Sequence, residues 1–151
     1  MRNERKKKLL CSLLILANLA FIWGNSLLDG SDSGSLSGGI LAWINSILGL
    51  DESGAELLHH LIRKAAHFTE FACLGCLLAW RWSMDHAPNG VLLPALLGMA
   101  AAVVDETIQL FTPDRGPSLK DVWIDTSGVI TGVMLLILGQ YVWKKYKLKQ
   151  Q

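Results

Sequence analysis

Long apolar runs constrain the fold of this chain more than any other feature. Four segments are mostly apolar, at about 9–28, 64–82, 91–111 and 122–143. A helix of roughly 20 apolar residues crosses the hydrocarbon core of a bilayer, and inside lipid a helix satisfies its own backbone hydrogen bonds. The sequence therefore predicts an all-α membrane protein: a bundle of four transmembrane helices that forms a single integral-membrane domain over residues 1–151.

The charged residues predict how these helices are oriented. With four spans, both chain ends and the loop SMDHAPNG lie on one side of the membrane, and ten of the 14 Lys and Arg residues lie there. On the opposite side of the membrane lie 11 of the 13 Asp and Glu residues. Because Lys and Arg concentrate in cytoplasmic segments, both termini are expected in the cytoplasm. The basic lead-in RNERKKK is also compatible with a signal peptide, but IWGNSLL lacks a small-x-small cleavage site, which favours an uncleaved first span.

Between the first two spans, the sequence predicts a short helix on the outer membrane surface. ILAWINSILGL is apolar but too short to span, and Trp43 suits the headgroup level; a helix packed on the bundle is the alternative. Ser53 and Glu56 have the spacing of a capping box, which predicts a helix start at Ser53. Ser118 or Asp121 is expected to cap the last helix.

Polar residues recur at helical spacing in the second, third and fourth spans. They are His60, Arg63, Lys64, His67 and Glu70 in the second, Asp105, Glu106 and Gln109 in the third, and Asp121 and Asp125 in the fourth. Small residues continue the same faces, including the Gly128-x-x-x-Gly132 pair that allows close helix contact. Since an ionised Asp exposed to lipid costs about 2.5–3.5 kcal/mol at mid-membrane, we expect the polar groups to converge inside the bundle near its outer end.

The segment TPDRGPSLKD, between the third and fourth spans, predicts an anion site. Arg115, Ser118 and Lys120 surround the start of the last helix, where free backbone N–H groups and the helix dipole favour a phosphate or carboxylate. Arg115 could hold such a group through two hydrogen bonds. In the alternative interpretation, Arg115 and Lys120 neutralise the chain's own carboxylates.

The converging acids could also bind a divalent metal ion. No other cofactor is expected. His67, Glu70, Asp105 and Asp121 are the candidate ligands, since carboxylates suit Mg²⁺, Ca²⁺ or Mn²⁺ and one imidazole permits Zn²⁺. The alternative is an ion-pair network with the basic residues of the second span.

Whether the protein is an enzyme stays open at this point. His67, Glu70 and Glu106 are the candidates for general acid–base catalysis, because buried sites of this kind shift pKa values. The full predicted ligand-binding set is Arg63, His67, Glu70, Asp105, Glu106, Gln109, Arg115, Ser118, Lys120, Asp121 and Asp125.

Three motifs resemble the VanZ-like family of bacterial membrane proteins. They are RKAAHFTEF at 63–71, DETIQLFTPDRGPSLKD at 105–121 and DTSG at 125–128, and the likeness covers about Arg63 to Leu136. Asp125 stands where this family often has Asn, and Phe71 where Tyr is frequent. The resemblance implies a multi-pass protein of the bacterial cytoplasmic membrane and cell envelope, a family associated in some members with resistance to teicoplanin, a lipid-tailed glycopeptide antibiotic.

The favoured function is binding of a lipid or lipidated-glycopeptide headgroup in the outward-facing polar corner, with a contribution to teicoplanin resistance. The alternative is a membrane-embedded, metal-assisted hydrolase or transferase acting on lipid-linked phosphate. A third interpretation treats the corner as an ion-pair lock that holds the bundle together. The expected partners are membrane lipids and a lipid-linked or glycopeptide ligand, with no nucleic acid; the oligomeric state is not predicted.

Overall fold

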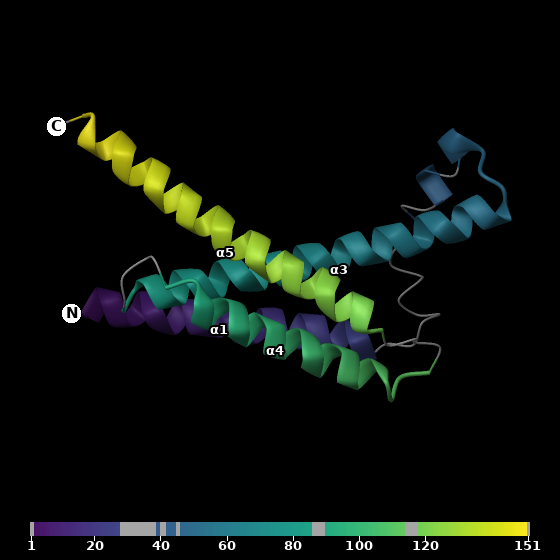
Figure 1. Cartoon of the computed structure of the whole chain (residues 1–151), viewed down its shortest axis with the longest axis horizontal. Coiled ribbons are helices and arrows are strands. Elements are labelled where there is room, and N and C mark those ends of the chain that lie inside the picture. The colour runs from purple at the N-terminus through teal and green to yellow at the C-terminus, as the bar shows by residue number, and fades with distance from the viewer. Residues whose placement is uncertain are drawn as a thin grey trace.

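Four long helices make up most of the protein. The computed structural model describes residues 2–27, 39, 42–44, 46–85, 90–113 and 118–150. Its helices are α1 (Arg2–Leu27), α3 (Glu52–Ser83), α4 (Leu92–Gln109) and α5 (Leu119–Leu148), labelled in Figure 1. No β-strand occurs among the described residues, so the predicted all-α class is confirmed.

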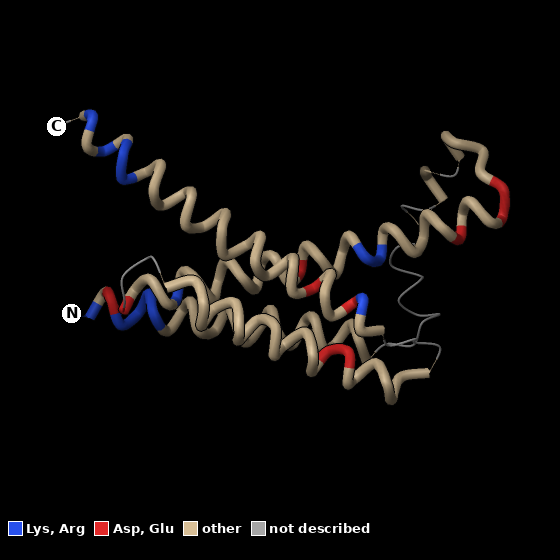
Figure 2. Tube along the Cα trace, in the orientation of Figure 1, with Lys and Arg blue, Asp and Glu red and all other residues tan. Residues whose placement is uncertain are grey.

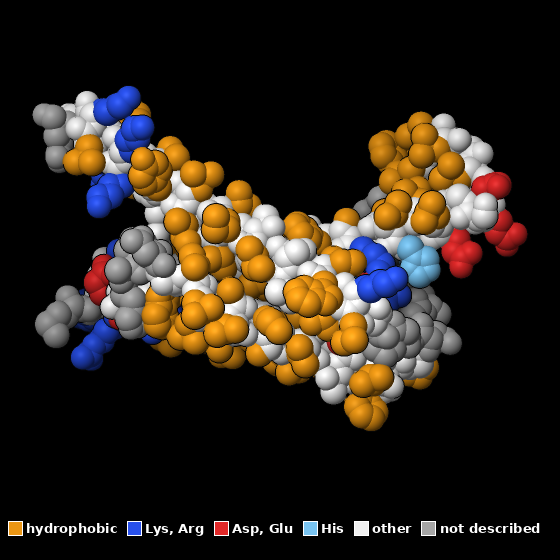
Figure 3. All heavy atoms as spheres, in the orientation of Figure 1, with side chains coloured by type: hydrophobic (Ala, Val, Ile, Leu, Met, Phe, Trp, Pro, Cys, Tyr) orange, Lys and Arg blue, Asp and Glu red, His pale blue; other side chains and the backbone are white. Residues whose placement is uncertain are grey.

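Three of these helices can cross a membrane by length and composition. They are α1, α4 and α5; α3, which carries Arg63, Lys64 and Glu70, is not among them. Large apolar side chains lie on the outside of the bundle, such as Leu16, Leu96 and Leu138, and they cover the middle of the face seen in Figure 3. Water disfavours such a surface, whereas lipid accommodates it.

Helix α3 is the centre of the bundle, because it packs against α1, α4 and most extensively α5. The contact with α5 is made at small residues: the α carbons of Gly128 and Gly132 face the backbone carbonyls of Phe68 and Ala72. A Cβ at Gly132 would overlap the Ala72 carbonyl oxygen. The predicted close approach through the Gly128-x-x-x-Gly132 pair is therefore confirmed, and it brings the polar faces of both helices together.

Beyond this contact, α5 diverges from α1 and α4 toward the C-terminus (Figure 1). Gly139, which the sequence places on the same stripe, has nothing within 4 Å of where its Cβ would be. Buried apolar side chains fill the region where the helices meet: Ile22, Phe71, Leu74, Ala79, Ala101, Ala102, Val129 and Val133. The tight seam is thus confined to the middle of α3 and the first half of α5.

The helix starts differ in part from the sequence prediction. Helix α3 is capped by Asp51, whose side chain accepts a hydrogen bond of 2.9 Å from the Gly54 backbone N–H, so the predicted cap at Ser53 is wrong by two residues. The Ser53 hydroxyl instead donates to Asp51. Ser118 caps α5 as predicted. Residues 42–44 and 46–48 are helical, and their position at the membrane surface stays a prediction.

Both chain termini lie at one end of the bundle (Figure 1). Basic residues gather there on α1 and α5 with a few acidic residues beside them, while most acidic residues lie farther along the helices and at the opposite end (Figure 2). Asp85, just after α3, forms ion pairs with Lys8 of α1 and Arg81 of α3. This carboxylate therefore joins two helices at the basic end.

The Asp85 ion pairs predict a strongly acidic titration. Hydrogen bonds from Lys8 and then Arg81 lower the pKa of Asp85 from 3.8 to about 2. Because the folded-state pKa is lowered, the pairs stabilise the fold above pH 3.8 and lose this contribution as the pH falls through about 2. The carboxyl carbon resonance of Asp85 should titrate near pH 2, and near 3.8 in the double variant Lys8→Met/Arg81→Met. An unchanged midpoint in the double variant would contradict these pairs.

Candidate functional site

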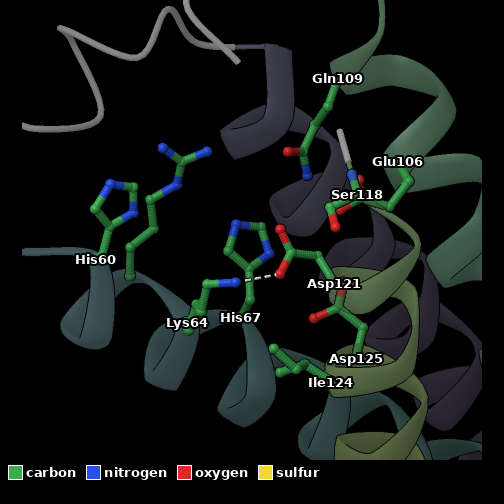
Figure 4. A pocket seen from close by; sticks show the side chains of 10 residues that line it. His60, Lys64, His67, Glu106, Gln109, Ser118, Asp121, Ile124 and Asp125 are labelled. Carbon is green, nitrogen blue, oxygen red and sulfur yellow. Dashed lines mark hydrogen bonds and ion pairs between the residues drawn. The ribbon is translucent and has the colours of Figure 1, made fainter. Parts of the chain in front are cut away.

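A polar pocket lies between α3, α4 and α5, toward the end of the bundle away from the chain termini. Its volume is about 340 Å³, and Figure 4 shows its side chains from close by. The lining residues are His60, Arg63, Lys64, His67, Glu106, Gln109, Ser118, Asp121, Ile124 and Asp125. The predicted convergence of polar groups from three helices is therefore present in the structure.

Asp105 is the hub of a buried hydrogen-bond network behind this pocket. Its side chain is 0% exposed; Oδ1 accepts a 2.7 Å hydrogen bond from the Ser26 hydroxyl of α1, and Oδ2 accepts one of 2.8 Å from the Gln109 amide of α4. The His67 Nδ1 of α3 lies 3.9 Å from Oδ2. Three helices thus meet at one carboxylate, which costs much less to bury when its oxygens are hydrogen-bonded.

Asp125 of α5 is the second buried carboxylate at this place. It is 1% exposed, and within the described residues its Oδ2 accepts no hydrogen bond. Ligand atoms of His67, Asp105 and Asp125, one from each residue, all lie within 4.8 Å of one another. These three side chains form the His67–Asp105–Asp125 cluster.

The basic side chains of α3 are not equivalent. Lys64 forms an ion pair with Asp121 of α5, drawn as a dashed line in Figure 4. Arg63 also lines the pocket and is half-buried, and it forms no ion pair with any carboxylate of the described chain. Arg63 is therefore the cation of the pocket that remains available to an anionic ligand.

At the start of α5, an acid of the chain itself accepts a hydrogen bond from one backbone N–H. The Ser118 backbone N–H donates a 2.8 Å hydrogen bond to Glu106 Oε2. Because Glu106 occupies this N–H, the chain's own carboxylate acts as the anion at the helix start. One donor of the predicted anion site is therefore engaged by Glu106. Because Arg115 lies outside the described residues, anion binding at this helix start stays a prediction.

An apolar groove adjoins the polar pocket on the α4–α5 side. Its volume is about 470 Å³, and it is lined by Met99, Val103, Glu106, Thr107, Leu110, Ser118, Leu119, Val122, Trp123 and Thr126. Glu106 and Ser118 belong to both lining sets. The Glu106–Ser118 pair therefore borders both spaces, one polar and the other apolar.

Among the described residues, three members of the predicted ligand-binding set do not line the pocket: Asp105, which lies behind it, Glu70 and Lys120. Glu70 lies one turn after His67, where α3 faces α1, and its Oε1 accepts a 3.2 Å hydrogen bond from Asn25. Lys120 is exposed on the outside of α5. Arg115 lies outside the described residues. Glu70 was placed in the pocket wrongly because α3 crosses the bundle, so successive turns of one face meet different neighbours.

The candidate metal and catalytic sets change accordingly. Of the four predicted metal ligands, His67 and Asp105 are brought together, whereas Glu70 contacts α1 and Asp121 pairs with Lys64. Asp125 takes the third position. Among the catalytic candidates, His67 and Glu106 line the pocket; their catalytic role stays a prediction.

His60 and Lys64 line the pocket. They belong to the predicted polar face of the second span but not to the predicted ligand-binding set. Ser26 and Asn25 of α1 also contact the acids. The only signal for α1 was a polar pair near the end of an otherwise apolar run, and its partners depend on helix packing.

The chain is similar to a known protein family. A protein-family model described as VanZ/LLP1 matches residues 9–140, which include all four long helices in whole or in large part. No curated protein and no solved structure matches the chain. The three apolar helices and this match together indicate a multi-pass membrane protein. The chain belongs to the VanZ/LLP1 family.

Proposed function

We propose that this protein binds the anionic headgroup of a membrane amphiphile, a phosphorylated lipid, in the polar pocket and its acyl chain in the apolar groove. The observation that carries the proposal is that Glu106 and Ser118 border both the polar pocket and the apolar groove. A ligand with a charged head and an apolar tail would satisfy both at once. A free anion would leave the groove without a role, and a purely apolar ligand would leave the pocket without one.

The charges of the pocket support an anionic head. Arg63 has no ion-pair partner among the described residues, and a guanidinium can hold a phosphate through two parallel hydrogen bonds. Lys64 is held by Asp121 but stays within the pocket lining. Acids that surround Arg63 would orient the guanidinium and accept hydrogen bonds from hydroxyl groups of the ligand.

A lipid ligand also requires the pocket to lie within reach of the membrane. In the proposed arrangement α3 is a fourth membrane span whose first turns project from the outer surface, and both termini are in the cytoplasm. The basic residues at the end of the bundle that holds both termini favour this orientation (Figure 2). The pocket would then open toward the outer leaflet of the bacterial cytoplasmic membrane, in the cell envelope.

Membership of the VanZ/LLP1 family adds a second source for the same chemistry. A lipidated glycopeptide such as teicoplanin also combines an acyl tail with a polar, ionised head. Binding of teicoplanin in this site would link the protein to resistance. Phosphorylated lipid is the favoured ligand, since the free guanidinium suits phosphate, and the glycopeptide is an outcome of the test.

Arg63→Gln should weaken binding of phosphatidic acid at least tenfold. Removing one charge-assisted hydrogen-bond donor costs about 1.5–3 kcal/mol, and 1.4 kcal/mol corresponds to tenfold in affinity. Binding can be measured by native mass spectrometry of the chain from nanodiscs of phosphatidylcholine doped with phosphatidic acid. Diacylglycerol with the same acyl chains should bind weakly to both proteins, because it lacks the phosphate.

Lys120→Gln is the matched control, since it removes one positive charge from an exposed position outside the pocket. It should bind phosphatidic acid like the wild type. Equal binding of phosphatidic acid and diacylglycerol, or equal losses in the Arg63 and Lys120 variants, would refute the headgroup site. Parallel titration with teicoplanin and its deacylated core would show whether the glycopeptide competes for the same residues.

A further inference from the structure

We propose that the inner end of the pocket binds a divalent transition-metal cation such as Mn²⁺ or Zn²⁺ through His67, Asp105 and Asp125. The ion would coordinate a phosphate oxygen of the headgroup, and only this role rests on the proposed function. Binding of the ion itself needs nothing but the three side chains. They come from α3, α4 and α5, so the ion would also join these helices.

The geometry of the His67–Asp105–Asp125 cluster fits one small ion. Bonds from a transition metal to imidazole nitrogen and carboxylate oxygen are about 2.0–2.2 Å, which puts two ligand atoms of one ion at most about 4.4 Å apart. One atom from each of the three residues lies within 4.8 Å of the others, and His67 Nδ1 to Asp105 Oδ2 measures 3.9 Å. Side-chain adjustments of a few tenths of an ångström would close the site.

Asp125 provides an independent indication of a ligand. Its side chain is 99% buried, given a relative exposure of 1%, and Oδ2 has no hydrogen-bond partner among the described residues. It lines the pocket, and Figure 4 shows it beside His67 and Asp121. A buried carboxylate oxygen without a partner is costly, and a cation at the cluster would supply the missing interaction.

Asp105 has the surroundings of a metal ligand. Ser26 and Gln109 each donate a hydrogen bond to it, one to each oxygen. Metal-binding carboxylates are commonly oriented by such hydrogen bonds, which fix the direction of the remaining lone pairs. Because the donors come from α1 and α4, the orientation of Asp105 is set before any ion binds.

The charges of the cluster favour a divalent ion. Asp105 and Asp125 together carry two negative charges when ionised, which one divalent ion neutralises. Lys64 is engaged by Asp121, and the described residues give Arg63 no ion pair with either aspartate. One imidazole and two carboxylates suit Mn²⁺ or Zn²⁺ better than Mg²⁺ or Ca²⁺, which prefer oxygen ligands alone.

The test is metal binding by the full-length chain without added phosphatidic acid. Protein in detergent is stripped with EDTA, dialysed and titrated with MnCl₂, with free Mn²⁺ measured by electron paramagnetic resonance. Mn²⁺ is the probe because the free thiols of Cys73 and Cys76 would attract Zn²⁺. Pulsed measurements on the same samples report whether a nitrogen nucleus is coupled to the bound ion.

We expect one Mn²⁺ per chain with a coupled nitrogen, and binding at least tenfold weaker in both Asp125→Asn and His67→Gln. Glu56→Gln, at an exposed acid on α3, is the matched control and should bind like the wild type. No saturable binding by the wild type, binding unchanged in Asp125→Asn, or a bound ion without a coupled nitrogen would each overturn the site. If one variant does not fold, the other and the nitrogen coupling still decide.

Failure of this proposal can be separated from failure of the headgroup proposal. Phosphatidic acid binding is measured on the EDTA-stripped wild type and again with one equivalent of Mn²⁺. Tighter lipid binding with Mn²⁺ would support the bridging role. A preference for phosphatidic acid without any metal binding would refute only the metal-site proposal. Metal binding without a preference for phosphatidic acid would refute only the headgroup proposal.

Discussion

Gly132→Ala is expected to destabilise the protein by about 3 kcal/mol, because a Cβ at this position meets backbone that cannot move aside. It would overlap the Ala72 carbonyl oxygen and approach the Cys76 backbone nitrogen within 2.9 Å. Helices α3 and α5 would have to separate along the seam where the Cys76 thiol also contacts the Gly132 carbonyl oxygen at 3.0 Å. Separation would also widen the pocket, since both helices line it.

Gly139→Ala provides the matched control, because it is the same substitution on the same helix. Nothing lies within 4 Å of the new Cβ, and Ala favours a helix over Gly by up to about 1 kcal/mol. Unfolding of both variants can be followed by titration with SDS in mixed micelles. Gly132→Ala should be less stable than the wild type, and Gly139→Ala should be as stable or more so. Equal stabilities would mean that the seam is not tightly packed.

Asp105→Ala is expected to lower the free energy of unfolding by about 3 kcal/mol. The substitution removes two hydrogen bonds to a charged group and leaves the Ser26 hydroxyl and the Gln109 amide buried without this acceptor. Asp105→Asn keeps the shape and one carbonyl oxygen, so its loss should be smaller. The same SDS titration, with EDTA present throughout, measures the loss without a contribution from metal.

Glu56→Ala is the control for this prediction, because Glu56 is an exposed acid on α3. Its stability should stay within about 0.5 kcal/mol of the wild type, as for most surface substitutions. Coupling between Ser26→Ala and Asp105→Asn, measured by a double-mutant cycle, should exceed 0.5 kcal/mol because the two residues are in contact. Asp105→Ala as stable as Glu56→Ala would refute the buried network.

The apolar runs and the small-residue spacing were sufficient to predict the helices and their central contact. Four helices cover the four predicted spans, and Gly128 and Gly132 meet α3 as expected. Periodicity works here because a helix of known pitch fixes which residues share a face. It does not fix where that face stops contacting its neighbour: Gly139 continues the stripe of Gly128 and Gly132, yet nothing lies within 4 Å of where its Cβ would be.

The site could be predicted only as a region. Charged residues inside apolar helices must face inward, so the convergence of Asp105, Glu106 and Asp125 followed from the sequence. Their individual partners did not, because these depend on how the helices cross. The crossing directs Glu70 toward Asn25 of α1 and places Ser26 of the same helix against Asp105.

Short-range competition explains the remaining differences. Asp51 and Ser53 are both residue types that cap helices. Asp51 is the cap here because its carboxylate accepts a hydrogen bond from the Gly54 N–H. The start of α5 has free N–H groups that favour any anion, and Glu106 lies near enough to supply one from within the chain. Sequence patterns identify such donors and acceptors but do not rank intramolecular partners against an external ligand.

The central claim is that a lipid phosphate occupies the polar pocket while its acyl chain lies in the apolar groove between α4 and α5. The most direct measurement is photo-crosslinking in phosphatidylcholine nanodiscs with a phosphatidic acid that carries a diazirine on its acyl chain near the headgroup, followed by mass-spectrometric mapping. Adducts are expected to concentrate on groove residues such as Val103, Leu110 and Val122 and to be lost in Arg63→Gln. Adducts spread evenly over the apolar surface, or the same adducts from a matching diacylglycerol probe, would contradict the claim.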